Sequence, residues 1–126
     1  MPDDAILDGK RVFLVEDEAL VAMLVEDMLA DEGCTLVASA NRLAEALAKA
    51  TDRSVEFDLA ILDVNLAGEP VFPVAEALAA RGIPFAFATG YGAGGLPDAW
   101  QSRPTLQKPF TARDIRAVLA SMVQPA

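Results

Sequence analysis

Short apolar runs alternate with helical patterns of apolar residues along this chain. The apolar runs predict strands at 11–15, 35–39, 58–62, 84–88 and, more weakly, 105–107. The third and fourth runs are apolar at successive positions, which is typical of strands that are covered on both faces.

Helices are predicted in the segments between and after these strands. Their expected ranges are 18–32, 42–50, 74–81 and 111–123. Gly33 and Gly82 stand where a left-handed residue commonly ends a helix. Asn41 is the expected N-cap of the second helix. Thr111, followed three residues later by Asp114, has the capping-box pattern at the start of the last helix.

The regular alternation of strand and helix predicts an α/β fold. Because β-α-β crossovers are right-handed, the strands should form one parallel sheet with helices on both of its faces. The segment 90–104 interrupts this pattern, since five of its first eight residues are Gly or Pro. We therefore expect no full helix there, only a short one near 97–102. No linker divides the chain, which predicts a single domain over residues 1–126.

Composition and charge exclude several classes of function. The chain is 53% hydrophobic and 23% charged, as folded globular domains are, and its net charge of −9 argues against non-specific nucleic-acid binding. No apolar run approaches the roughly 20 residues of a membrane span, and no secretory signal is present, so a cytoplasmic location is expected. Cys34 is the only cysteine and is expected to be buried and inert. The absence of histidine excludes Ser-His-Asp triads and histidine-ligated metals.

Polar residues follow four of the predicted strands. In an open parallel sheet, ligands bind at the carboxyl ends of the strands. Glu16 and Asp17 follow the first strand, Asp63 the third, Thr89 the fourth and Lys108 the fifth. Three carboxylates at one edge repel one another, and a hard divalent cation such as Mg²⁺ offsets that repulsion.

These residues stand in short motifs that resemble a known family. The chain has VED at the first strand, ILD at the third, AT at the fourth and KPF at the fifth. This set, in this order and over essentially the whole chain, is similar to the receiver domain of two-component response regulators. The resemblance implies a flavodoxin-like (βα)5 doubly wound sheet with strand order 2-1-3-4-5. It also implies a stand-alone response regulator that is not an enzyme and has no output domain.

The resemblance also assigns a metal site and a phosphoacceptor. Asp63 would accept a phosphoryl group from a phosphohistidine on a histidine kinase or histidine phosphotransferase. Glu16 and Asp17 would hold Mg²⁺, with Mn²⁺ as an alternative, together with Asp63 and the backbone carbonyl of Asn65. Phosphoryl transfer depends on positioning and charge neutralisation, so the lack of histidine in this chain is no obstacle.

Two further groups would contact the phosphoryl oxygens. Lys108 would pair with one oxygen, and the hydroxyl of Thr89 would donate to another. The Lys108–Pro109 peptide bond is expected to be cis, as in the family.

The sequence departs from the common receiver pattern at several positions. Glu16 replaces the more common aspartate and is expected to ligate the metal through water. Thr105 stands where most receivers have an aromatic residue, and we hypothesise that Tyr91 takes part in the switch instead. The stretch Phe-Ala-Thr-Gly followed by an aromatic is similar to the FATGUY subgroup, which is linked to stress signalling. That subgroup has tyrosine at the sixth motif position, where this chain has Gly92.

The first predicted helix offers a surface for the partner protein. Its expected core residues are Val21, Leu24, Val25 and Met28. Ala19, Leu20 and Met23 would then lie near the site at an exposed edge and form a docking surface. We expect a monomer or weak dimer.

Other readings of the chain explain fewer of its features. Gly90, Gly92 and Gly95 match a dinucleotide-binding pattern, but they follow the fourth strand and precede Pro97, not a helix start. A dehalogenase-type phosphatase would need a second acid at Asn65, and a flavodoxin-like phosphate loop would not be acidic. The main alternative is a receiver-shaped adaptor that binds partners without being phosphorylated.

Overall fold

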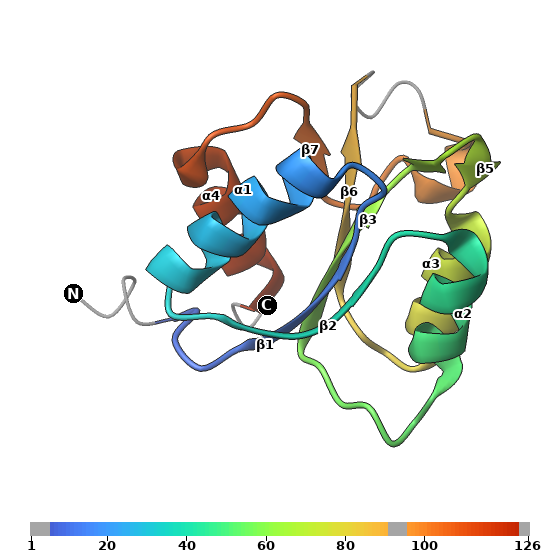
Figure 1. Ribbon diagram of the computed structural model, residues 1–126, viewed down its shortest axis with the longest axis horizontal. Helices are drawn as coiled ribbons and strands as arrows, with labels where there is room; N and C mark the ends of the chain where they lie inside the picture. Colours follow the sequence, from blue (N-terminus) through green and yellow to red (C-terminus); the bar gives the residue numbers. More distant parts are fainter. Residues whose placement is uncertain (1–5, 91–95, 124–126) are drawn as a thin grey trace.

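A parallel five-stranded sheet forms the centre of the molecule (Figure 1). The structure, a computed structural model, describes residues 6–90 and 96–123. The strands of this sheet are β1 (Arg11–Val15), β2 (Thr35–Ala40), β3 (Leu59–Asp63), β6 (Phe85–Thr89) and β7 (Thr105–Gln107). They lie in the order β2-β1-β3-β6-β7, which is the expected order 2-1-3-4-5.

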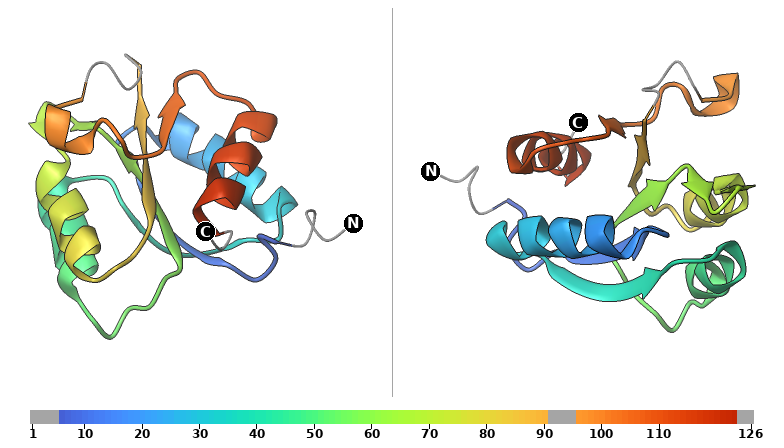
Figure 2. Two further views of the ribbon diagram at one scale, coloured as in Figure 1. Left: turned by 180° about the vertical axis from the view of Figure 1, so that it is seen from behind. Right: turned by 45° about the horizontal axis from the view of Figure 1, so that its top comes forward.

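Helices cover both faces of the sheet, which confirms the doubly wound α/β class. They are α1 (Ala19–Asp31), α2 (Leu43–Thr51), α3 (Phe72–Ala80) and α4 (Ala112–Val123). The helices α1 and α4 lie on one face, and α2 and α3 lie on the other (Figure 2). In the described part of the chain, no helix is long and apolar enough to cross a membrane.

The two apolar layers explain why the central strands are apolar at successive positions. Along β1, Val12 and Leu14 enter the layer beneath α1 and α4, whereas Phe13 and Val15 enter the layer beneath α2 and α3. The strands β3 and β6 alternate in the same way and are buried at every position. Because both faces are covered, polar side chains are left for the strand ends.

Glycines end two helices, and a capping box begins another, as the sequence predicts. Gly33 follows α1 with φ +82° and Gly82 follows α3 with φ +73°, a left-handed conformation that glycine adopts without steric cost. Before α4, the N–H of Asp114 donates to Oγ1 of Thr111 at 3.1 Å, and the N–H of Thr111 donates to Oδ2 of Asp114 at 2.9 Å. This reciprocal pair confirms the predicted capping box.

Two helix starts differ from the prediction. Asn41 is not the N-cap of α2, because the helix begins one residue later and Arg42 holds that position without a side-chain cap. The N–H of Asn41 donates instead to Oε1 of Glu45 at 3.3 Å. The helix α3 begins at Phe72, two residues before the predicted start, because Pro73 fits the first turn of a helix.

The connections that follow β3 and β6 set the local geometry of the site. After β3, the chain forms a hairpin of β4 (Asn65–Leu66) and β5 (Glu69–Pro70), which the sequence did not predict. Between β6 and β7, the described residues form a short 3-10 helix, η3 (Asp98–Trp100), where the other crossover connections contain an α-helix. This agrees with the disruption expected from the glycines and prolines of the segment.

Candidate phosphoacceptor and metal site

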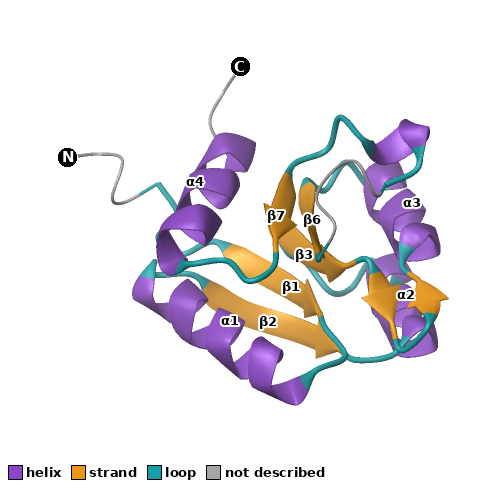
Figure 3. Cartoon of the chain, turned by 90° about the horizontal axis from the view of Figure 1, so that it is seen from above, coloured by secondary structure: helices purple, strands orange, loops and turns teal. Residues whose placement is uncertain are grey.

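The carboxyl ends of the strands bring the predicted site residues to one edge of the sheet (Figure 3). A cavity of about 260 Å³ lies there. Side chains or backbone of the segments after β1, β3 and β7 line it, namely Asp17, Glu18, Asp63, Asn65, Ala67, Gly68 and Lys108. Asp17, Asp63 and Lys108 therefore face a common space, whereas Glu16 and Thr89 do not line this cavity.

Lys108 joins two buried carboxylates. Its Nζ lies 3.1 Å from Oε1 of Glu16 and 3.2 Å from Oδ2 of Asp63. Burial lowers the pKa of Lys108, but the negative charges of Asp63 and Glu16 outweigh burial and raise that pKa overall. The amine is therefore a fixed positive charge beside the carboxylate of Asp63.

Asp63 ends β3 with only 6% of its surface exposed. Burial, then the nearby charge of Glu16, raises the pKa of Asp63 to about 7. The ammonium of Lys108 opposes this rise but does not cancel it. Ionising this buried carboxyl group without a neutralising partner costs free energy. A divalent cation beside the carboxylate would offset that cost.

A hydrogen bond from the hairpin holds Asp17. The backbone N–H of Ala67 donates to Oδ2 of Asp17 at 3.0 Å. Partial burial acts to raise the pKa of Asp17, but its interactions with Asp63 and with the N–H of Ala67 lower that pKa overall. Asp17 is therefore an anion at neutral pH.

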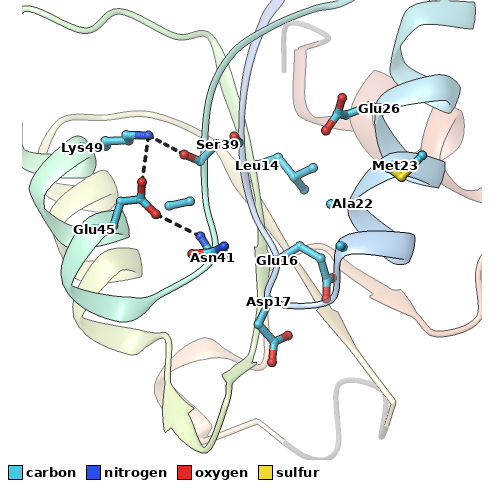
Figure 4. A pocket seen from close by; sticks show the side chains of 12 residues that line it. Leu14, Glu16, Asp17, Ala22, Met23, Glu26, Ser39, Asn41, Glu45 and Lys49 are labelled. Atoms are coloured by element: carbon cyan, nitrogen blue, oxygen red, sulfur yellow. Dashed lines mark hydrogen bonds and ion pairs between the residues drawn. The ribbon is translucent and has the colours of Figure 1, made fainter.

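The side chain of Glu16 contacts two other groups of the protein. Besides its pairing with Lys108, Oε2 of Glu16 accepts the backbone N–H of Glu18 at 3.2 Å, at the start of α1. Glu16 and Asp17 also border a second cavity of about 390 Å³, with Glu45 and Lys49 on its far wall (Figure 4). Lys49 pairs there with Glu45 at 3.5 Å and does not reach the site.

The backbone of Asn65 points toward Asp63. The N–H of Val71 donates to the carbonyl of Val64 at 2.9 Å, which makes Asn65 and Pro70 a non-hydrogen-bonded pair of the hairpin. In such a pair, the N–H and C=O of each residue point away from the partner strand. The N–H of Asn65 accordingly donates to Oδ1 of Asp63 at 3.3 Å, and its carbonyl points to that same side.

Thr89 and Lys108 are connected through their main chains. Thr89 ends β6 and is 6% exposed. Its carbonyl accepts the backbone N–H of Lys108 at 2.8 Å, so the two residues that would contact the phosphoryl group are neighbours. The Lys108–Pro109 peptide bond is cis, the isomer expected from the resemblance.

The donor set fits a hard divalent cation. Carboxylate oxygens of Glu16, Asp17 and Glu18 lie within 4.8 Å of one another, and Asp63 lines the same cavity as Asp17. Oxygen ligands with room for water are what Mg²⁺ requires. The residues therefore fit the metal that the strand-end carboxylates predicted.

The exposed side of α1 is more apolar than expected. Leu20 is 76% exposed and Met23 is 59% exposed, and Ala19 beside them is also exposed. Leu24 was predicted to be in the core, but it is 58% exposed because only Val25 and Leu29 turn fully inward from this helix.

Some features near the site carried no sequence signal. The N–H of Ala67 reaches Asp17 only because of the conformation of the hairpin. At Thr105, the hydroxyl donates to the carbonyl of Arg103 at 3.1 Å. Trp100 of η3 stacks on Phe72 with ring centroids 6.3 Å apart, and it also packs against Phe87.

Tyr91, the proposed switch residue, lies outside the described residues, as does Gly92.

Comparison with known proteins gives one consistent family. The family model described as the response regulator receiver domain matches residues 12–120. The chain is 44% identical to SdrG from Sphingomonas melonis Fr1 over 92% of this chain and 98% of that chain, with a TM-score of 0.80. It is likewise 44% identical to the BeF3-activated conformation of SdrG from Pseudomonas melonis Fr1, over 90% of this chain and 96% of that chain, with a TM-score of 0.77.

More distant similarity extends to a longer protein. The response regulator PhyR from Brucella abortus is 26% identical over 96% of this chain and 50% of that chain, with a TM-score of 0.78. A search of curated proteins found no match. The match to the family model covers most of the sequence, and the parallel sheet with its strand order agrees with the receiver fold. The chain therefore belongs to the response regulator receiver domain family, whose members are signalling modules and not enzymes.

Proposed function

We propose that this receiver domain accepts a phosphoryl group onto Asp63 from a phosphohistidine of a partner protein. The observation that carries the proposal is the buried carboxylate of Asp63, paired with Lys108 at 3.2 Å and lining one cavity with Asp17. An oxygen of Asp63 attacks phosphorus, a P–O bond forms, and the P–N bond to the partner's imidazole breaks. The electron pair of that bond stays with the imidazole nitrogen, so the chain itself supplies no acid or base.

We propose that Asp17, Asp63 and the backbone carbonyl of Asn65 hold Mg²⁺, with Glu16 contributing through water. Mn²⁺ suits the same oxygen donors. The metal, when bound, neutralises charge on the phosphoryl oxygens. We propose that Lys108 supplies the second positive charge and that the hydroxyl of Thr89, the last residue of β6, donates to a phosphoryl oxygen.

The family implies a histidine kinase as partner, and a histidine phosphotransferase is the related donor. We propose that Ala19, Leu20 and Met23 form its docking surface. Leu20 and Met23 expose apolar side chains on α1, the helix that begins directly after Glu16 and Asp17. A partner bound there would bring its phosphohistidine to the edge where Asp63 lies.

We propose that the signal is a change in the segment from Thr89 to Gly95 and the neighbouring face. Thr89 is the last residue of β6, where this segment begins, and η3 with Trp100 follows the segment along the chain. We further propose that the domain acts in the cytoplasm in a stress response, as a monomer or weak dimer. The similarity to SdrG and PhyR supports a signalling role.

Incubation with Mg²⁺ and acetyl phosphate, followed by intact mass measurement, tests the proposal. We expect the mass of one added phosphoryl group on the wild type and none on Asp63→Ala or in excess EDTA. Asp58→Ala, which removes a carboxylate at the opposite edge of the sheet, is the matched control and should be modified normally. No mass gain would favour the phosphorylation-independent adaptor, and a gain that survives Asp63→Ala would contradict Asp63 as the phosphoacceptor.

A further inference from the structure

The turn between β4 and β5 has an unusual conformation for its sequence. Its central residues are Ala67 with φ +51° and Gly68 with φ +92°. Positive φ at both central positions is typical of a type I′ hairpin turn, which favours Asn or Gly at the first of them. Ala67 is the only non-glycine residue with positive φ in the described part of the chain. Such a conformation persists only where surrounding contacts determine it.

Both central N–H groups of this turn are held by side chains. Oδ1 of Asn65 accepts the N–H of Gly68 at 2.7 Å, and Oδ2 of Asp17 accepts the N–H of Ala67 at 3.0 Å. Asp17 and Ala67 are 50 positions apart, so the second bond ties the loop after β1 to the hairpin after β3. The turn therefore presents one donor across the site to one oxygen of Asp17.

We infer that the side chain of Asn65 is a positioning residue for Asp17. By fixing the turn through Gly68, it orients the N–H of Ala67, and that N–H fixes the carboxylate of Asp17 with its other oxygen left to bind a cation. The inference rests on the proposed Mg²⁺ site for its effect on the metal. It assigns the Asn65 side chain a role separate from that of its backbone carbonyl.

Magnesium affinity, measured by calorimetry on the full chain, tests the inference. Groups that orient a metal ligand typically change affinity by about 10- to 100-fold when removed. We expect Asn65→Ala, which keeps the backbone carbonyl, to weaken Mg²⁺ binding about tenfold. Asn65→Asp keeps the acceptor oxygen and should not weaken it, and Ala67→Gly keeps the N–H and should stay within about twofold of wild type.

A matched control separates positioning from general loss of stability. Oδ1 of Asp52 accepts the N–H of Ser54 at 2.9 Å in a turn before β3, at the other edge of the sheet. Asp52→Ala should leave Mg²⁺ affinity unchanged. Equal affinities for Asn65→Ala and the wild type, or an equal loss in Asp52→Ala, would overturn the inference.

A readout without metal distinguishes this inference from the proposed function. In metal-free protein, the amide proton resonance of Ala67 should move upfield in Asp17→Ala and in Asn65→Ala, and stay in place in Asn65→Asp. If the wild type does not bind Mg²⁺ but these shifts occur, the proposed metal site fails and the positioning role stands. If the Ala67 resonance is the same in Asn65→Ala and wild type, the positioning role fails.

Discussion

The ammonium group of Lys108 lies 3.2 Å from Oδ2 of Asp63, and both side chains are held at the same edge of the sheet. The contact places a positive charge beside one oxygen of the carboxylate. The charge of Lys108 would repel a bound metal cation but attract the oxygens of a phosphoryl group. Substitution of Lys108 should therefore separate metal binding from phosphoryl transfer.

Lys108→Met should bind Mg²⁺ more tightly and accept phosphate more slowly. Loss of the lysine charge removes its repulsion of the metal. Unit charges several ångströms apart interact by about 1–2 kcal/mol, which corresponds to about a tenfold change in affinity. The same loss removes neutralisation of the transferring group, which is typically worth on the order of 100-fold in rate. Calorimetry gives the first effect, and the rate of mass gain with acetyl phosphate gives the second.

Lys49→Met is the matched control, because Lys49 pairs with Glu45 on α2 and does not contact Asp63. It should change neither quantity. Parallel changes of affinity and rate in Lys108→Met would contradict the assigned roles.

The metal-free protein should lose stability as pH rises through about 7, the raised pKa of Asp63. A carboxyl whose pKa is higher in the folded chain stabilises the fold fully below its unfolded pKa, and that contribution is lost as pH rises through the folded pKa. Wild type and Asp63→Asn should differ least in melting temperature at the low-pH end of the series, near pH 5 in EDTA. Between pH 5 and pH 8, the stability of Asp63→Asn relative to the wild type should rise by about 3 kcal/mol.

Magnesium gives the internal check of this result. At pH 8 it should raise the melting temperature of the wild type and leave that of Asp63→Asn nearly unchanged. A stability difference that stays constant between pH 5 and pH 8 in EDTA would show that Asp63 does not titrate in this range.

Glu16→Gln should lower the pKa of Asp63 without restoring its ordinary value. Burial is the main cause of the raised pKa and is kept, whereas the charge of Glu16 is the second cause and is removed. The side-chain carboxyl resonance of Asp63, followed by ¹³C NMR against pH without metal, measures this. Glu26→Gln removes an exposed carboxylate of α1 that borders a cavity with Glu16, and it should leave the pKa of Asp63 unchanged. An equal fall in both variants would indicate a general effect of net charge.

Thr111→Ala should destabilise the protein by about 1 kcal/mol, because it removes an N-cap whose hydroxyl accepts the N–H of Asp114. Thr111→Ser keeps the hydroxyl and should retain most of that stability. Chemical denaturation of the two variants measures the difference. Phosphorylation by acetyl phosphate should be the same in both, because α4 contributes no side chain to the cavity near Asp63.

The strand-end residues could be predicted because a parallel topology places them without further information. Once β1 and β3 are neighbouring parallel strands, Asp17 and Asp63 must come to one edge. The hairpin could not be predicted in this way, since β4 and β5 have two residues each and show no periodicity. The bond from Ala67 to Asp17 depends on a left-handed alanine, which the sequence pattern disfavours.

The exposure of Leu24 shows a second limit of the sequence pattern. On α1, apolar residues occupy every position from 19 to 25, so a helical period does not single out the buried stripe. Packing against the sheet selects Val25 and Leu29, and Leu24 is left at the surface near Leu20. An exposed group of large apolar side chains at this position calls for a partner.

Leu20→Ser combined with Met23→Ser should slow phosphotransfer from a phosphohistidine-bearing donor but not from acetyl phosphate. Both side chains are more than half exposed, so their removal takes little from the core and mainly removes apolar contact area from the proposed docking surface. The measurement compares initial rates of phosphorylation with the protein donor and with the small donor. Val37→Ser, which alters an exposed valine on β2, is the matched control and should slow neither rate. Equal slowing with both donors would place the effect in the site and not on α1, and unchanged rates with the protein donor would move the docking surface elsewhere.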